Sequence, residues 1–207
     1  IFNGMASILT LVAAGALLQQ SAQRKGRRDE ILETNLYIAR NVANVVLNRL
    51  QKWGAEVERA AANPELARHL EAWNSSVPAC LLNGPEGTWL QNFCEELHRR
   101  KDPALENWHI LDSRGFMVGR TPDSTIRGKD FSARDYFKGT MAHADGRIHV
   151  SSVYRSVADN LYKFDICAKV FAGDRVVGVI AVSVTTDPSW GLPDIHDVRR
   201  KAVLIAP

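Results

Sequence analysis

Hydrogen-bonding side chains gather next to aromatic rings in one stretch of the sequence, DFSARDYFKGTMAHADGRIHVSSVYRS at residues 130–156. Arg134, Tyr136 and Phe137 fall within one turn of a short predicted helix. A guanidinium beside aromatic faces is a good receptor for a carboxylate or another planar anion, because its donors form a rigid fork. The cluster therefore indicates a pocket that binds a small anion, with the nearby Lys129 as a further donor.

The same residues also have a purely structural interpretation. Arg134 could pair with Asp130 or Asp135 on the surface, where such ion pairs stabilise a protein by less than about 1 kcal/mol. Tyr136 and Phe137 could simply fill the core beneath this segment.

Strand alternation adds further candidates to the predicted pocket. Ser152 and Tyr154 are two residues apart, so in an extended strand their side chains point to the same face. In the next predicted strand Asp165 belongs to a polar set that faces the pocket or solvent. In the last strand Ser183 shares a face with small residues and Val177, as expected of a pocket floor.

No catalytic or metal-binding motif accompanies these residues. His109, His143 and His149 invite a catalytic interpretation, but no nucleophile elbow, metal-ligand spacing or carboxylate pair lies with them. We therefore expect no catalytic residue, no bound metal and no cofactor in this chain. The net charge of +3, from 26 basic and 23 acidic residues, is too balanced to indicate a nucleic-acid partner.

The elements that position the pocket begin with a long helix. The 207 residues have ordinary globular composition, with 45% hydrophobic and 24% charged residues. Apolar residues recur every three or four positions over residues 28–62, which predicts one amphipathic helix. We expect its first turns to pair with a second copy of the chain and its later turns to pack on the domain. The stripe consists of Leu32, Leu36, Ala39, Val42, Val46, Leu50, Trp53, Val57 and Ala60.

Two shorter helices and a sheet follow. Asn63 and Pro64 end the long helix and start the next, as N-cap and first helical residue. After Pro103 the periodicity changes from near 3.6 to 2, which predicts strands. The predicted helices are 65–73, 88–100 and 132–144, and the predicted strands are 107–111, 116–120, 147–155, 161–171 and 175–184. This order predicts an α+β fold, a long N-terminal helix packed on a five-stranded antiparallel PAS-like sheet.

Both ends of the chain lie outside this predicted domain. Residues 1–18 carry no charge, and residues 1–20 are interpreted as most of a transmembrane helix, since about 20 apolar residues cross a bilayer. A signal-peptide core and a buried soluble helix are the alternatives. Basic residues at 24–28 follow the apolar run directly, a position that usually marks the cytoplasmic side. Residues 187–207 are a linker or the start of another element.

Three cysteines complete the inventory of reactive side chains. Cys80 and Cys94 bracket a turn-rich loop, and in an oxidising compartment a disulfide between them would stabilise the fold by about 3 kcal/mol. Cys167 lies in an alternating strand and is interpreted as a small buried hydrophobe.

The order of these segments resembles the Cache family of PAS-like sensor domains, which bacterial chemoreceptors, histidine kinases, cyclases and some protein kinases hold outside the cytoplasm. The resemblance rests on the long helix ending in NPELARHL, the hairpin ILDSRGFMVGR, the segment GKDFSARDYF running into VSSVYRS, and the closing hairpin AGDRVVGVIAVSV. Together these segments span roughly residues 30–186. The resemblance implies that small metabolites bind beneath a lid over the sheet, in a receptor of the inner membrane with its sensor domain in the periplasm or outside the cell.

The resemblance also implies roles for individual residues. Arg134 and Tyr136 match the ligand-anchoring pair on the short helix, and Tyr154 matches the strand tyrosine. Two positions depart from the amino-acid-binding members: Ser183 stands where an acid receives the ligand's ammonium group, and Lys129 where a tyrosine is expected. Losing one buried charged partner costs about 2–5 kcal/mol, so the departures favour a carboxylate or other anion over an amino acid.

A sensor domain is therefore the first hypothesis for this chain, with a small-molecule ligand, the membrane and possible homodimerisation through the long helix as its partners. The second hypothesis is a ligand-free dimerisation or spacer domain of the same kind of receptor. The third, an enzyme, lacks the motifs it requires.

Overall fold

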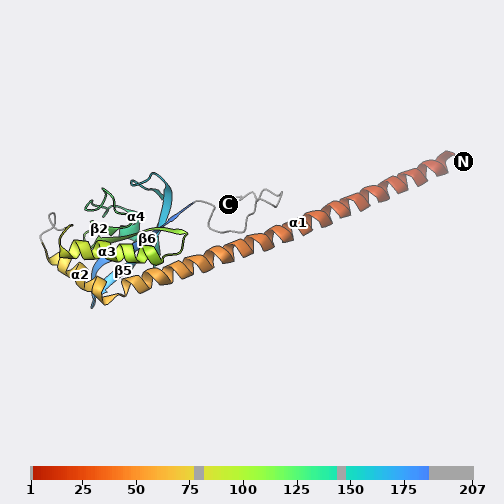
Figure 1. Ribbon diagram of the computed structural model, residues 1–207. Coiled ribbons are helices and arrows are strands. Elements are labelled where there is room, and N and C mark those ends of the chain that lie inside the picture. The colour runs from red at the N-terminus through yellow and green to blue at the C-terminus, as the bar shows by residue number, and fades with distance from the viewer. Residues whose placement is uncertain (1, 77–81, 144–147, 187–207) are drawn as a thin grey trace. The chain divides into compact units, whose positions relative to one another are not determined.

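The computed structural model describes residues 2–76, 82–143 and 148–186, with side chains from residue 23 onward (Figure 1). The chain divides into two units, one containing residues 1–48 and the other Arg49–Gly191. The predicted linker at 187–207 lies outside the described residues. The pocket prediction concerns the second unit alone.

Helix α1 runs from Phe2 to Ala61 without interruption, so the predicted helices at 1–20 and 28–62 are one element. In the first unit most side chains between residues 23 and 48 are exposed, including the apolar Leu32 and Leu36 at 54% and 52% exposure. No helix in the described part of the chain combines the length and hydropathy that crossing a bilayer requires. The transmembrane helix at residues 1–20 stays a prediction, because the side chains of residues 2–22 are not described.

The second unit contains the last turns of α1, three further helices and six strands. The α-helices are α2 (Pro64–Ser75), α3 (Pro85–Arg100) and α4 (Asp135–Ala142). The strands are β1 (Leu105–Asp112), β2 (Met117–Arg120), β3 (His149–Val150), β4 (Tyr154–Arg155), β5 (Tyr162–Ala172) and β6 (Arg175–Thr185). They form one antiparallel sheet in the order β2-β1-β6-β5-β3, with β4 also paired to β5. The predicted α+β class is confirmed.

The predicted third strand differs from expectation, because it is broken into β3 and β4. Val150 pairs with Ile166 and Tyr154 with Lys163, so three residues on one side oppose two on the other. The extra residue is a bulge, which shifts the alternation of side chains between the two faces. At this break in the strand, the hydroxyl of Ser151 accepts a hydrogen bond from the backbone N–H of Asp165, at 2.8 Å.

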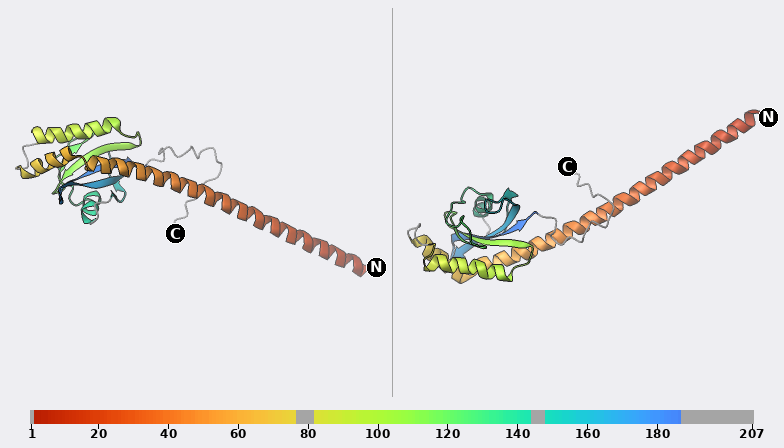
Figure 2. Two further views of the ribbon diagram at one scale, coloured as in Figure 1. Left: turned by 90° about the horizontal axis from the view of Figure 1, so that it is seen from below. Right: turned by 45° about the horizontal axis from the view of Figure 1, so that its top comes forward.

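The two faces of the sheet have different covers. Helices α2 and α3 lie on one face and α4 on the other, as two views of the molecule make clear (Figure 2). The larger apolar cluster, on the first face, includes Trp53 and Val57 from the end of α1, both fully buried. The prediction that the later turns of the long helix are buried is therefore confirmed.

One residue of β6 was assigned to the wrong face. Val177 belongs to the helix-side cluster, although alternation grouped it with Ser183. The register of β5 and β6 shifts between Val170 and Phe171, opposite Val177, and this irregularity breaks the alternation. Val179 and Ala181, beyond the shift, lie on the α4 side as predicted.

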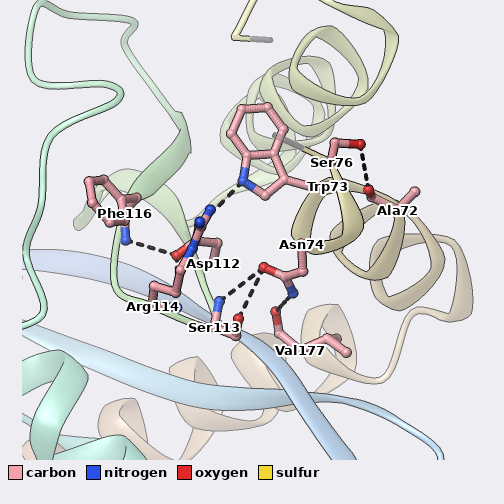
Figure 3. Close-up of polar contacts among 9 residues, drawn as sticks. All are labelled: Ala72, Trp73, Asn74, Ser76, Asp112, Ser113, Arg114, Phe116 and Val177. Atoms are coloured by element: carbon pink, nitrogen blue, oxygen red, sulfur yellow. Dashed lines mark hydrogen bonds and ion pairs between the residues drawn. The ribbon is translucent and has the colours of Figure 1, made fainter. Parts of the chain in front are cut away.

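Polar side chains fix both ends of α2. The predicted cap is confirmed, since the side chain of Asn63 accepts from the backbone N–H groups of Glu65 and Leu66 at 2.8 and 3.3 Å. At the other end of α2, Asn74 donates to the carbonyl of Val177 at 2.7 Å and accepts from the hydroxyl of Ser113 at 3.1 Å (Figure 3).

Asp112 organises the β1–β2 turn from the end of β1 (Figure 3). Its carboxylate is fully buried and accepts from the backbone N–H groups of Arg114 and Phe116 at 2.9 and 3.0 Å. The guanidinium of Arg114 and the indole N–H of Trp73 also donate to it. A buried carboxylate with this many donors is a structural acid, because each donor offsets part of its desolvation.

Candidate functional site

The candidate site is a pocket between the sheet and the segment that leads into α4. A second apolar cluster fills this face and includes Phe131, Tyr136 and Phe137 from the segment, with Val179 and Ala181 from β6. Beside the cluster lies a pocket with many polar side chains. Its lining is Asn107, His109, Met117, Arg120, Ile126, Phe131, Arg134, Tyr136, Tyr154, Ser156, Val157 and Ser183.

The pocket is nearly closed in this conformation. The space open to the centre of a water-sized sphere is about 20 Å³, roughly enough for one water molecule. A larger and more open groove of about 450 Å³ adjoins it and shares Asn107 and Arg120 as walls. A metabolite larger than water therefore requires side chains of the pocket to move.

Four of the predicted site residues line this pocket. They are Arg134, Tyr136, Tyr154 and Ser183. Arg134 is the N-cap of α4, one residue before the helix itself. Its guanidinium carbon lies 5.9 Å from the ring centre of Tyr154, close enough for a cation–π contact. The rings of Tyr136 and Tyr154 are 5.4 Å apart, so the tyrosine ring beside the guanidinium packs in turn on a second tyrosine.

Neither acid proposed as a surface partner of Arg134 forms that pair. Asp130 accepts from the backbone N–H of Ser132 at 2.8 Å, and Asp135 accepts from that of Ser152 at 2.6 Å. These bonds fix the loop before α4 and join the start of α4 to the segment between β3 and β4.

Three predicted site residues lie elsewhere. Phe137 is buried in the apolar cluster beneath α4, as the structural interpretation proposed. Lys129 is exposed, and its backbone forms two hydrogen bonds: its N–H donates to the carbonyl of Ile126 at 3.1 Å, and its carbonyl accepts from the N–H of Met117 at 3.0 Å. Ser152 is exposed because the bulge in the third strand reverses its face, so its predicted place beside Tyr154 is wrong.

Asp165 lies immediately behind the pocket wall and is fully buried. The hydroxyl of Tyr154 is 2.9 Å from each of its carboxylate oxygens. Burial raises the pKa of Asp165 to about 7, although Ser183, Tyr154 and the cations of Lys163 and Arg120 oppose the shift. Burial, and then the charge of Asp165, likewise raises the pKa of Tyr154, so its phenol stays protonated.

His109 is the most deeply buried imidazole of the site, at 3% exposure. Its Nε2 has no hydrogen-bond partner among the described residues and lies 3.6 Å from a carboxylate oxygen of Asp165, too far for a hydrogen bond. Burial first, then the charges of Arg120 and Lys163, lower the pKa of His109 to about 3. His109 is therefore a neutral group that lines the pocket, and its Nε2 is available for a hydrogen bond to a ligand.

Arg120 is the most important residue that the sequence interpretation missed. It is 5% exposed, lies opposite His109 in the sheet and lines both the pocket and the groove. Its side chain donates to the carbonyl of Pro122 at 2.6 Å, while its backbone exchanges two hydrogen bonds with the side chain of Gln91. The missed signal was alternation in the first hairpin: Asn107 and His109 are polar residues two apart in a buried strand.

A buried ion cluster closes the far end of this face. Lys163 is 1% exposed and forms ion pairs with Glu106 and Asp159. Glu106 and Asp159 also line the groove. Because Lys163 is paired on the groove side, its charge is compensated there, and we assign it a structural role.

The predicted disulfide has one partner within the described residues. Cys94 is fully buried against β2, and burial raises the pKa of its thiol well above the usual range. Cys94 is a free thiol in this structure and Cys80 lies outside the described residues, so the pairing remains a prediction. Cys167 is buried, as expected. The described residues contain no group of three or more His, Cys, Asp or Glu side chains arranged to hold a metal ion.

Solved structures share this architecture at low sequence identity. The sensor domain of the histidine kinase DctB from V. cholerae has a TM-score of 0.57 and 15% identity, covering 70% of this chain and 52% of that one. The ligand-binding domain of the Pseudomonas fluorescens chemoreceptor CtaA, in complex with L-isoleucine, has a TM-score of 0.52 and 18% identity, covering 81% and 60%. No family model matches the sequence, and no curated protein does.

This likeness concerns the fold. The chain spans 52% and 60% of the lengths of the two domains, so it corresponds to part of each. The PAS-like α+β fold implied by the Cache resemblance is confirmed.

Proposed function

We propose that residues 28–186 form the ligand-binding sensor domain of a membrane receptor, and that its pocket binds a small organic anion. One observation carries the proposal: two arginines, Arg134 and Arg120, line a single pocket. Carboxylates are the natural partners of guanidinium forks, and charge-assisted hydrogen bonds are about twice as strong as neutral ones. The neutral His109 and the phenol of Tyr136 supply further polar contacts around an anion.

The two arginines come from different elements, which suggests how binding becomes a signal. Arg134 precedes α4, whereas Arg120 ends β2. An anion that contacts both joins the α4 segment to the sheet, and a nearly closed pocket must rearrange to admit it. A ligand with different affinity for the closed and rearranged conformations shifts the population between them.

An amino acid is the second candidate ligand, and Asp165 favours it. The sequence places Ser183 where an acid is expected, but Asp165 is paired directly opposite Ser183 in the sheet. A carboxyl group is therefore available one strand away to receive an ammonium group. The chemoreceptor domain of similar fold was solved with L-isoleucine.

The membrane setting and the oligomeric state belong to the same proposal. Residues 1–20 would anchor the chain in the inner membrane, and the domain would lie outside the cytoplasm. The exposed apolar residues of α1, including Ile31, Leu32 and Leu36, would pair with those of a second copy. Sedimentation equilibrium of the wild-type chain and of Leu32→Glu/Leu36→Glu tests the pairing, with a monomeric wild type as the contradicting result.

A ligand screen tests the central claim. Organic acids and amino acids are tested by thermal shift, and the hits by calorimetric titration against wild type and Arg134→Ala. We expect Arg134→Ala to weaken binding by about 2 kcal/mol or more, roughly thirtyfold in Kd. Arg155→Ala, an exposed arginine on β4, is the matched control and should bind as wild type does.

The remaining outcomes separate the alternatives. Asp165→Asn should weaken the binding of amino acids while leaving simple carboxylates unaffected or tighter. Equal binding by wild type and Arg134→Ala would contradict the anion site. A library in which no compound raises the melting temperature would favour the spacer hypothesis, because a ligand at 100 times its Kd adds about 2.7 kcal/mol.

A further inference from the structure

Two histidines meet at the end of α4, apart from the pocket. His143 is the C-cap of α4 and His149 is the first residue of β3. The Nε2 of His143 lies 3.3 Å from the Nδ1 of His149, and the ring centres are 5.3 Å apart. His143 is exposed and His149 half-buried, so solvent reaches the pair.

The close approach of His149 to α4 depends on Gly139. A Cβ atom built on Gly139 would lie 2.2 Å from the Nε2 of His149 and 2.4 Å from its Cε1, well inside van der Waals contact. The ring of His149 therefore rests on the helix backbone at the one residue without a side chain. This contact fixes the ring and turns its Nδ1 toward His143.

The separation of the two nitrogens suits a shared metal ion. With metal–nitrogen bonds of about 2.0–2.1 Å, nitrogens 3.3 Å apart subtend roughly 105–110° at the metal, the tetrahedral value. If both lone pairs point at that ion, ring geometry places the ring centres about 5.2 Å apart, compared with the 5.3 Å present here. A single hydrogen bond between the rings satisfies the same distance, so experiment must separate the two.

The surroundings of His149 match those of a metal ligand. Its other nitrogen, Nε2, has no hydrogen-bond partner among the described residues and lies 3.7 Å from a carboxylate oxygen of Asp135. In metal sites the second imidazole nitrogen commonly faces a carboxylate, which orients the ring and raises its basicity. Lys169 donates to the backbone carbonyl of His143 and so fixes the second ligand residue from β5.

We propose that His143 and His149 form a binding site for a divalent transition-metal ion that prefers imidazole, namely Zn²⁺, Ni²⁺ or Cu²⁺, with water completing the coordination. Imidazole nitrogen suits these ions, whereas Mg²⁺ and Ca²⁺ prefer oxygen. The ion would join the end of α4 to β3. It would restrain the helix that carries Tyr136 and that follows Arg134, and its binding requires no occupant of the pocket.

Calorimetric titration of the tag-free 207-residue chain with NiCl₂ and ZnCl₂ at neutral pH tests the site. We expect one ion per chain, with at least tenfold weaker affinity in each of His143→Ala and His149→Ala. His98→Ala, a histidine on α3, is the matched control and should bind as wild type does. Unchanged affinity in either paired variant, or no binding below about millimolar metal, would overturn the proposal.

Two further measurements address the geometry. Gly139→Ala keeps both imidazoles but displaces the ring of His149, so it should also lose at least tenfold in affinity. Electron paramagnetic resonance of the Cu²⁺-loaded chain should report two nitrogen ligands in wild type and one in His143→Ala. A spectrum with one nitrogen in wild type would mean that the rings form only a hydrogen bond. MgCl₂ should produce no heat in any variant.

Discussion

The phenolic oxygen of Tyr154 lies 2.9 Å from both carboxylate oxygens of Asp165, and neither residue is fully accessible from the pocket. The bond joins β4 to β5 at the point where the third strand is broken. Because the Tyr154 hydroxyl donates its proton to Asp165, that proton is not available to a ligand that enters the pocket.

Tyr154→Phe should destabilise the domain by about 1–3 kcal/mol, because the buried carboxyl of Asp165 loses a donor. The free energy of unfolding in urea measures the change. Tyr162→Phe, at an exposed tyrosine on β5, is the control and should stay within about 0.5 kcal/mol of wild type. An equal loss in the two variants would contradict a specific role for the Tyr154 hydroxyl.

Asp165→Asn should change the pH dependence of stability. The folded-state pKa of Asp165 is raised to about 7 from an ordinary value of 3.8, so the folded protein holds this proton more tightly than the unfolded chain. Its contribution to stability is therefore fully present below pH 3.8 and is lost as the pH rises toward 7, by about 1.4 kcal/mol for each pH unit within that range.

Urea denaturation of both proteins at pH 5 and pH 8 measures this effect. Asparagine does not titrate, so Asp165→Asn should gain stability relative to wild type between the two pH values. A difference between the proteins that is independent of pH would show that Asp165 keeps an ordinary pKa.

Asn74→Ala should cost about 1–3 kcal/mol of stability. Among the described residues, Asn74 is the only side chain that joins α2 both to Ser113 in the β1–β2 turn and to the backbone of β6, and its loss leaves those groups unsatisfied. The exposed Ser75, one residue along α2, provides the control Ser75→Ala, for which we expect a change below about 0.5 kcal/mol. Thermal melts of the two variants give the comparison, and similar midpoints would refute the role of Asn74.

Gly178→Ala should destabilise the sheet by about 1–3 kcal/mol through overpacking. A Cβ at this position would lie 2.5 Å from the carbonyl oxygen of Leu111 and 2.9 Å from a methyl carbon of Leu70. Gly26→Ala meets no atom within 4 Å and should leave the unfolding of the domain unchanged. Chemical denaturation of the pair checks the prediction, which fails if Gly178→Ala is as stable as wild type.

Much of the fold could be predicted because it rests on local signals. The burial of Trp53 and Val57, the cap at Asn63 and the strands β5 and β6 are predicted from neighbouring residues, and the structure confirms them. The residues that line the pocket could be predicted only in part from such local signals. Arg134, Tyr136, Tyr154 and Ser183 line the pocket, although Arg134 precedes α4 and Tyr154 follows the break in the third strand.

The errors follow from two kinds of nonlocal information. One extra residue in the third strand moved Ser152 away from the pocket, and a register shift in β5–β6 moved Val177 to the helix side. Arg120 was missed for another reason: the polar alternation that points to the pocket lies in β1, at Asn107 and His109, and not in the segment around Arg120 itself. Only the pairing of β2 with β1 brings it beside His109.

The small size of the pocket also bears on how strongly any ligand could bind. A pocket with space for about one water must open before a metabolite enters, and under the proposed function the open conformation would be the minor one. The observed Kd then equals the intrinsic Kd divided by the fraction of molecules in that minor conformation. Substitutions that loosen the closed form would lower the concentration at which the domain responds, without touching the arginines that recognise the ligand. The ligand concentration at which the domain responds and its choice of ligand would thus be set by different residues.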